Sequence, residues 1–246
     1  MRRPGKIILA ILVTIVVALI GLVVWAETPL GPMPEVNQTL KSDSTVNVIT
    51  GKWLVFSPVS SSNNTGLIIY PGGRVDYKSY APVAQALASK GYLTIIAPMP
   101  LNLAVFGINE ASSIIKSYPN LKSWAIGGHS LGGTMAAQFA YNNLSIIKGL
   151  VLWAAYPAAG NDFSNTNLAV VTIYGTNDGL VGLSQIVDSM KILPQDTLRV
   201  EISGGNHAQF GWYGNQPGDK EAAISRELQQ EQVVNATIQL LQKISN

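Results

Sequence analysis

The chain has 246 residues, of which 47% are hydrophobic and 12% are charged, and it contains no cysteine. The lack of cysteine excludes disulfides, thiolate metal sites and a cysteine nucleophile. The formal net charge is +2, but after the first 26 residues 13 basic residues stand against 14 acidic ones, so no basic excess favours binding to nucleic acid.

Residues 7–25 form a run that is almost entirely apolar. As a helix this run would span about 28 Å, close to the hydrocarbon thickness of a bilayer. Arg2, Arg3 and Lys6 precede it, and basic flanks stay in the cytoplasm, so we expect a single-pass membrane anchor with the remainder of the chain outside. The alternative is a signal peptide cleaved near Ala26, after which the protein is secreted, although the apolar core of a signal peptide is usually shorter.

From residue 46 onward, short apolar runs alternate with helical patterns. Predicted strands cover residues 46–49, 53–59, 67–70, 92–97, 124–127, 150–154, 170–174 and 198–202. Apolar residues at helical spacing fall over residues 79–91, 111–118, 135–140, 183–190 and 221–244. Because the strands are continuously apolar, we predict an α/β fold with a mostly parallel sheet covered by helices on both faces.

A serine stands between two glycines in Gly128-His129-Ser130-Leu131-Gly132. The stretch follows a predicted strand and precedes a predicted helix, which is the position of a nucleophile elbow. The backbone turn there is strained, so the residues two before and two after the serine must be very small. Such a string arises by chance in roughly one chain in ten of this length, so a simple glycine-rich turn is the alternative.

Two further polar residues follow later strands at the carboxyl edge of the predicted sheet, where open α/β sheets bind ligands. Asp178 follows the strand at 170–174, and His207 follows the strand at 198–202. The order Ser, Asp, His is that of an α/β hydrolase. A serine hydroxyl becomes nucleophilic when an imidazole takes its proton, and a carboxylate orients that imidazole. We therefore predict Ser130 as nucleophile, His207 as general base and Asp178 as the orienting acid.

Other residues of the same types are alternatives. His129, the only other histidine, adjoins the serine in the elbow, so its ring should point away from the nucleophile and pack. Asp162 follows the strand at 150–154, a position that some hydrolases use for the acid. The remaining aspartates after the serine are Asp188, Asp196 and Asp219.

Acyl transfer also needs two backbone N–H groups that face the oxyanion of the tetrahedral intermediate. Leu131, directly after the serine, is one candidate donor. Gly73 is the other, and the preceding Gly72 allows a close approach of the chain. Arg74 comes next and is a candidate for attracting an anionic substrate, with a solvated loop arginine as the alternative.

Four segments carry a family resemblance: residues 70–76 (YPGGRVD), 98–104 (PMPLNLA), 127–133 (GGHSLGG) and 204–211 (GGNHAQFG). They resemble the α/β hydrolase fold-5 family, which is related to the dienelactone hydrolases, and the resemblance runs from about residue 67 to the C-terminus. It implies Ser130 as nucleophile, Asp178 as acid and His207 as base. Dienelactone hydrolases use cysteine where this chain has Ser130, so lactonase activity does not transfer with the resemblance.

The segment of residues 156–167 is too short for a large lid domain, so we expect an open site for small or extended acyl substrates. Candidates to line an acyl pocket, each with core packing as the alternative, are Met99, Leu103, Phe106, Tyr156 and Trp212. No cofactor is expected, and no metal, because two histidines without cysteine make no ligand cluster.

The sequence thus predicts a basic tail at 1–6, a membrane anchor or signal peptide at 7–25, a spacer at 26–44 and a catalytic α/β domain at 45–246. The preferred function is a membrane-anchored serine esterase that works through an acyl-enzyme on a small-molecule acyl substrate. An acyltransferase that uses the same three residues is one alternative. A non-catalytic binding module on the hydrolase fold is another.

Overall fold

The computed structural model describes residues 4–60 and 63–245, and the described chain contains one eight-stranded sheet in the order β1-β2-β4-β3-β5-β6-β7-β8. The strands are β1 (Val46–Thr50), β2 (Leu54–Pro58), β3 (Thr65–Tyr70), β4 (Leu93–Ile96), β5 (Ser123–His129), β6 (Ile147–Trp153), β7 (Ala169–Gly175) and β8 (Leu198–Ile202). β1 and β2 pair antiparallel, and the strands from β4 to β8 pair parallel. The predicted mostly parallel sheet is confirmed.

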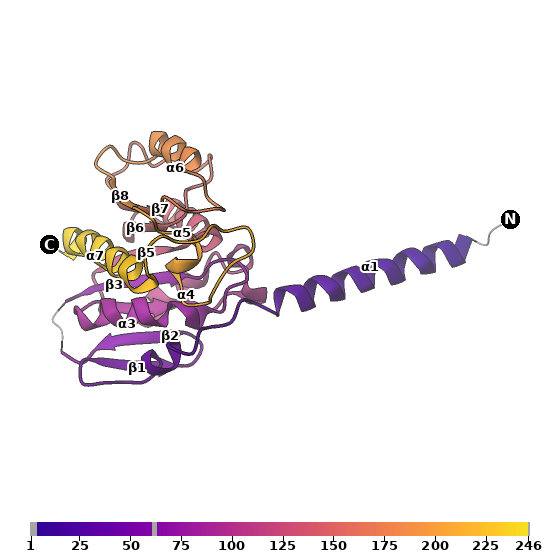
Figure 1. Ribbon diagram of the computed structural model, residues 1–246, viewed down its shortest axis with the longest axis horizontal. Coiled ribbons are helices and arrows are strands. Elements are labelled where there is room, and N and C mark those ends of the chain that lie inside the picture. The colour runs from indigo at the N-terminus through magenta and orange to yellow at the C-terminus, as the bar shows by residue number, and fades with distance from the viewer. Residues whose placement is uncertain (1–3, 61–62, 246) are drawn as a thin grey trace.

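Helices cover both faces of this sheet (Figure 1). They are α2 (Val36–Thr39), α3 (Ala81–Ser89), α4 (Glu110–Ser117), α5 (Leu131–Asn142), α6 (Leu183–Ser189) and α7 (Arg226–Ser245). α3 and α7 pack over one core cluster, and α4 and α5 contribute to the second cluster on the other face. The inner strands β3 to β7 are therefore mostly buried on both sides, as their apolar runs predict, whereas the edge strands β1 and β8 are partly exposed.

Loops that follow the parallel strands all lie at one end of the sheet. Three of them, after β3, β4 and β8, contain short 3₁₀ helices: η1 (Tyr77–Tyr80), η2 (Pro100–Asn102) with η3 (Ala104–Phe106), and η5 (Ala208–Phe210). η4 (Met190–Ile192) continues α6. The loop between β6 and β7, residues 154–168, contains neither helix nor strand, so no lid stands over that part of the site.

The N-terminal helix α1 (Pro4–Ala26) projects away from the domain (Figure 1). Its part Ile8–Ala26 is long and apolar enough to cross a membrane, and the large apolar side chains along it are exposed. The predicted spacer covers residues 26–44. Ala26 is the last residue of α1, and the residues that follow it lie against the domain. Leu30 forms a parallel bridge with Val75, and the Met33 N–H donates to the Trp212 carbonyl over 2.8 Å.

Candidate active site

Ser130 occupies the sharp turn between β5 and α5, with φ 53° and ψ −125°. This conformation is rare for a residue with a side chain and costs free energy that the surrounding packing must offset. A Cβ at Gly132 would lie 2.3 Å from the carbonyl oxygens of Tyr70 and Pro71, and one at Gly128 would lie 2.3 Å from the Tyr70 oxygen. The glycines flanking the serine are thus required by the turn, and the Ser130 side chain makes no capping hydrogen bond to α5.

His207 and Asp178 form a buried pair at the neighbouring strand ends. His207 Nδ1 lies 2.8 Å from Asp178 Oδ2, and each side chain is 1% exposed. The other carboxylate oxygen accepts the N–H groups of Leu180 and Val181, at 2.8 and 2.7 Å. Because the carboxylate only accepts, the proton of the neutral ring sits on Nδ1. Nε2 then remains a buried proton acceptor with no hydrogen-bond partner among the described residues.

His129 connects this pair to the serine turn. Its ring centroid lies 4.4 Å from that of His207, and it stacks on Phe210 at 5.6 Å. Since His129 directly precedes Ser130 in the chain, this contact brings the loop of the candidate base against the elbow. The ring itself is fully buried, in agreement with the packing role predicted for it.

Tyr80, which sequence reasoning missed, links His129 to the glycine pair after β3. Its hydroxyl accepts the Gly72 N–H over 3.0 Å and lies 2.8 Å from His129 Nδ1. Burial raises the pKa of Tyr80, so the hydroxyl keeps its proton and donates it to His129. A Cβ at Gly72 would lie 2.7 Å from His129 Nδ1 and 2.9 Å from the Tyr80 hydroxyl. This is the close approach expected of Gly72.

The two candidate oxyanion donors are neighbours in space. A Cβ built on Gly73 would lie 3.1 Å from Leu131 Cδ2. Leu131 is the first residue of α5, so its N–H has no acceptor within the helix and points along the positive end of the helix dipole. Gly73 and the Leu131 side chain therefore lie next to each other, in the loops that follow β3 and β5.

Asp219 connects the loop that contains Asp178 (the acid loop) to the loop that contains His207 (the base loop). Its Oδ1 accepts the Gly179 N–H over 2.9 Å, and its Oδ2 accepts the Ala208 N–H over 2.8 Å. Gly179 directly follows Asp178, and Ala208 directly follows His207. One carboxylate thus fixes the spacing of the candidate acid and base. The sequence offered Asp219 only as an alternative acid, because nothing in an irregular polar loop indicates such long-range contacts.

Two residues of α7 hold the base loop from the other side. Gln229 is fully buried, and its amide accepts the Asn206 N–H over 3.0 Å and donates to the Asn206 carbonyl over 2.8 Å. Arg226 donates to the carbonyls of Ala208 and Gly211. The position of the candidate base therefore depends on the C-terminal helix.

The remaining aspartates have partners elsewhere. Asp162 is exposed and accepts the Ser164 N–H over 2.9 Å. Asp188 pairs with Lys191 at 2.8 Å, and Asp196 pairs with Lys243 on the surface. The structure thus pairs His207 with Asp178, the carboxylate that the sequence favoured.

Arg74 binds the end of α1, which is neither of the roles considered from the sequence. Its Nε donates to the Trp25 carbonyl over 2.9 Å, its Nη2 donates to the Thr28 carbonyl over 2.7 Å, and its guanidinium lies 4.2 Å from the centre of the Trp25 ring. The Asn102 amide donates to the Ala26 carbonyl over 3.0 Å. Carbonyls at the end of α1, which lack partners within a helix, are satisfied by these donors.

Of the apolar residues considered for an acyl pocket, Met99 is buried in the core beside α4, whereas Phe106 is 58% exposed. Leu103, Tyr156 and Trp212 are half-buried. Core packing therefore accounts for Met99, and Phe106 lies on the surface of the loop after β4.

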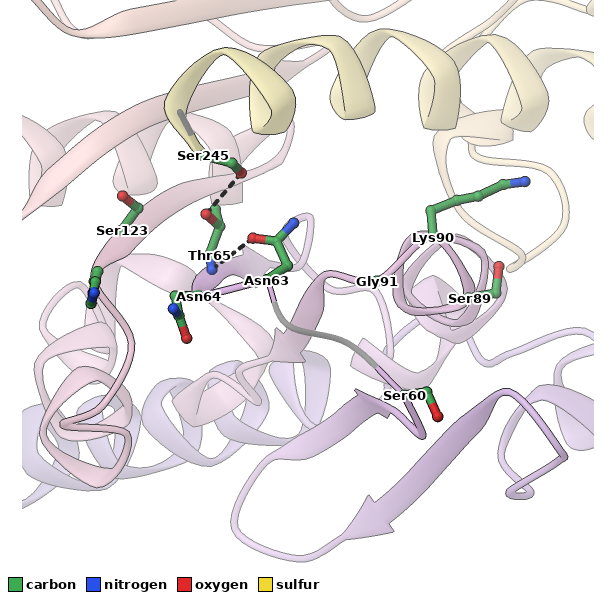
Figure 2. Close-up of a pocket in the computed structure, with 10 residues that line it drawn as sticks. Ser60, Asn63, Asn64, Thr65, Ser89, Lys90, Gly91, Ser123 and Ser245 are labelled. Carbon is green, nitrogen blue, oxygen red and sulfur yellow. Dashed lines mark hydrogen bonds between the residues drawn. The ribbon is translucent and has the colours of Figure 1, made fainter.

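A polar cleft of about 950 Å³ lies at the opposite, amino-terminal end of the strands (Figure 2). It is lined by Ser60, Asn63, Asn64, Thr65, Ser89, Lys90, Gly91, Lys122, Ser123 and Ser245. Neither histidine nor carboxylate is among these lining residues, so the cleft lacks the groups of acid–base catalysis found at the other end.

His129 should make the protein sensitive to mild acid. Burial, and to a lesser degree the neighbouring His207, lower the pKa of His129 well below 6.5. Below pH 6.5 the unfolded chain binds a proton at this residue that the folded protein does not, so stability present above pH 6.5 is lost as the pH falls. We expect the free energy of unfolding to drop by up to about 2 kcal/mol between pH 6.5 and 5, as followed by urea denaturation.

The matched variant is His129→Asn, which keeps an acceptor for the Tyr80 hydroxyl but removes the titrating ring. It should lose this part of the pH dependence, whatever its stability at neutral pH. If the free energy of unfolding of the variant falls with pH as steeply as that of the wild type, other groups cause the acid sensitivity.

Comparison with known proteins agrees with the observed fold. A family model described as alpha/beta hydrolase family matches residues 66–231. A search of curated protein sequences finds no match. Among solved structures, Est1E from Butyrivibrio proteoclasticus is 14% identical, with 81% of this chain and 100% of that chain covered and a TM-score of 0.56.

The thermophilic esterase Est2 from Thermogutta terrifontis is 12% identical, with 82% of this chain and 93% of that chain covered and a TM-score of 0.61. A structure of Thermogutta terrifontis esterase 2 phosphoramylated by tabun is 13% identical, with coverages of 82% and 96% and a TM-score of 0.60. Such low identities show the fold alone. The family model covers more than half of the sequence, and the chain belongs to the alpha/beta hydrolase family.

Proposed function

We propose that the protein is a serine esterase that hydrolyses carboxylic esters through an acyl-enzyme on Ser130. The observation that carries the proposal is the buried His207–Asp178 pair at 2.8 Å, in which the carboxylate orients the imidazole. The ring of His207 packs against His129, the residue before Ser130. The similar Thermogutta terrifontis protein is an esterase that is phosphoramylated by tabun, which supports the same chemistry here.

In the proposed reaction, Ser130 Oγ attacks the ester carbonyl carbon while its proton passes to His207 Nε2. Asp178 stabilises the imidazolium and keeps the Nδ1 proton in place. The N–H groups of Gly73 and Leu131 stabilise the oxyanion of the tetrahedral intermediate. His207 then gives its proton to the leaving alkoxide, and the alcohol departs. A water deprotonated by His207 attacks the acyl-enzyme and releases the carboxylic acid and Ser130.

The test is covalent labelling of the full-length protein in detergent with a fluorophosphonate probe, beside an assay of short p-nitrophenyl esters. We expect one probe per chain, on the peptide that contains Ser130, and no labelling of Ser130→Ala. Labelling that persists in Ser130→Ala would refute the assignment of the nucleophile. Labelling without turnover of any ester would favour the non-catalytic module, and turnover only in the presence of an alcohol acceptor would favour the acyltransferase.

We propose further that α1 is retained as a membrane anchor with the domain outside the cytoplasmic membrane. Support comes from the carbonyls of Trp25 and Ala26, which accept hydrogen bonds from Arg74 and Asn102, and from Ala26, which is fully buried. A signal peptide cleaved near Ala26 would lose these contacts. The intact mass of the membrane-bound protein checks this proposal, and a mature chain that begins after Ala26 would contradict it.

A further inference from the structure

The end of the anchor helix is attached to the two loops beside the candidate oxyanion hole. Arg74, which binds the Trp25 carbonyl and ring, directly follows Gly73, and neighbouring Cα atoms are about 3.8 Å apart. Asn102, which binds the Ala26 carbonyl, also accepts the Arg74 N–H on its own carbonyl over 2.8 Å. The last turn of α1 is therefore one residue away from a group proposed to face the reacting carbonyl.

Strained backbone accompanies this attachment. Arg74, Leu101 and Asn102 have positive φ values of 55°, 54° and 52°, although none of them is glycine. Each such conformation costs about 1–3 kcal/mol and persists where surrounding contacts hold it. In this protein those contacts include hydrogen bonds from Arg74 and Asn102 to the end of α1, so α1 and these loops are directly connected.

The chain that follows the helix leaves no slack between the bilayer and the domain. The Leu30 N–H donates to the Arg74 carbonyl over 2.8 Å, and the Asp76 N–H donates to the Leu30 carbonyl over 2.9 Å. Tryptophan at the end of a membrane-spanning run prefers the headgroup level. Trp25 at that level holds Arg74, and with it Gly73, at the membrane surface.

Exposed apolar side chains lie on the same loop as Asn102. Val105 is 41% exposed and Phe106 is 58% exposed, both in η3. Figure 1 shows α1 leaving the domain beside this part of the chain. Exposed apolar side chains next to a membrane-spanning helix gain free energy by entering the interface between headgroups and acyl chains.

We infer that the site opens toward the bilayer surface and that its substrates are ester lipids resident in the outer leaflet. The inference rests on the proposed esterase function and on the retained anchor. Ser130 is only half-buried, and residues 154–168 contain neither helix nor strand that could cover it, so a lipid ester group at the headgroup level can reach the serine turn. The side chains of Val105 and Phe106 in η3 hold the opening of the site, its mouth, against the membrane. Ser130, His207 and Asp178 lie behind this opening.

The orientation can be measured without activity, because the chain contains no cysteine. Phe106→Cys and Val59→Cys each create a single labelling site in the full-length protein. Val59 is 49% exposed and follows β2 at the far end of the sheet. In phosphatidylcholine vesicles, an environment-sensitive fluorophore at position 106 should be quenched by lipids spin-labelled near the headgroup, whereas one at position 59 should not. Equal quenching at the two positions would overturn the inference.

The substrate class is tested by a matched pair of surface variants, Val105→Asp and Val59→Asp. In the same vesicles, Val105→Asp should lower the hydrolysis of p-nitrophenyl palmitate about tenfold, because a charge in place of an apolar contact lifts the mouth from the lipid. Hydrolysis of water-soluble p-nitrophenyl acetate should stay within about twofold, and Val59→Asp should change neither rate.

The outcomes separate the two proposals. Equal palmitate ester hydrolysis by both variants would refute the bilayer-facing site while leaving the esterase intact. A wild-type protein that hydrolyses neither ester would refute the esterase itself, and the lipid substrate with it.

Discussion

Asp178→Asn should lower kcat for a short p-nitrophenyl ester by about 10,000-fold while the protein stays folded. Asp178 Oδ1 accepts two backbone N–H groups, from Leu180 and Val181, so the asparagine carbonyl oxygen would keep that position. The new amide NH₂ would then face His207 and donate to Nδ1. The ring proton would move to Nε2, which could no longer accept the proton of Ser130.

Asp162→Asn is the matched control, since Asp162 is the alternative acid by sequence but is exposed and bonded to Ser164. It should change kcat by less than about twofold, because surface substitutions outside the site have small effects. The kcat values are measured by the release of p-nitrophenol, and circular dichroism verifies that each variant is folded. A large loss of kcat in Asp162→Asn, together with an active Asp178→Asn, would show that Asp162 and not Asp178 is the orienting acid.

Gly132→Ala should cost more than about 3 kcal/mol of stability, or prevent folding altogether. The added Cβ would lie 2.3 Å from the carbonyl oxygens of Tyr70 and Pro71, which are backbone atoms at the end of β3 and cannot rotate away. Helix propensity predicts the opposite sign, because alanine is favoured over glycine inside a helix by about 1 kcal/mol. The sign of the effect therefore distinguishes close packing from propensity.

Gly160→Ala serves as the control, since a Cβ at Gly160 would meet no atom within 4 Å. Urea denaturation in detergent should show it within about 0.5 kcal/mol of the wild type. A Gly132→Ala protein as stable as Gly160→Ala would mean that β3 and α5 can separate without cost. Fluorophosphonate labelling of both variants would then report whether the serine turn survives.

The inner strands β3 to β7 were predictable because each is a short, mostly apolar run bounded by turn residues. Parallel strands that are buried on both faces leave this pattern in a sequence. The pairing of His207 with Asp178 also agrees with the prediction, which used only the positions of polar residues after strands. Helix ends were less predictable. The last helix, expected from residue 221, begins at Arg226, because Asn206 and Asn177 bind the carbonyls of Lys220 and Glu221.

Contacts between irregular segments left no pattern to read. Arg74 and Trp25 are separated by 49 residues, and Asp219 reaches Gly179 across 40 residues. Such contacts depend on where loops are brought by the folded sheet, and neither periodicity nor spacing reports them. The attachment of α1 to the loops of Arg74 and Asn102 is therefore a property of the tertiary structure that the sequence alone does not reveal.

The hydrogen bonds that hold the loop of His207 also determine when the site can form during synthesis. Asp219, Arg226 and Gln229 all follow His207 in the chain, and together they fix its loop. Domains generally fold as units once their residues have been made. A nascent chain that ends before residue 219 contains the residues of the serine turn but lacks the contacts that position the imidazole. The site is therefore complete only after residues 219–229 have been made and have folded against the loop of His207.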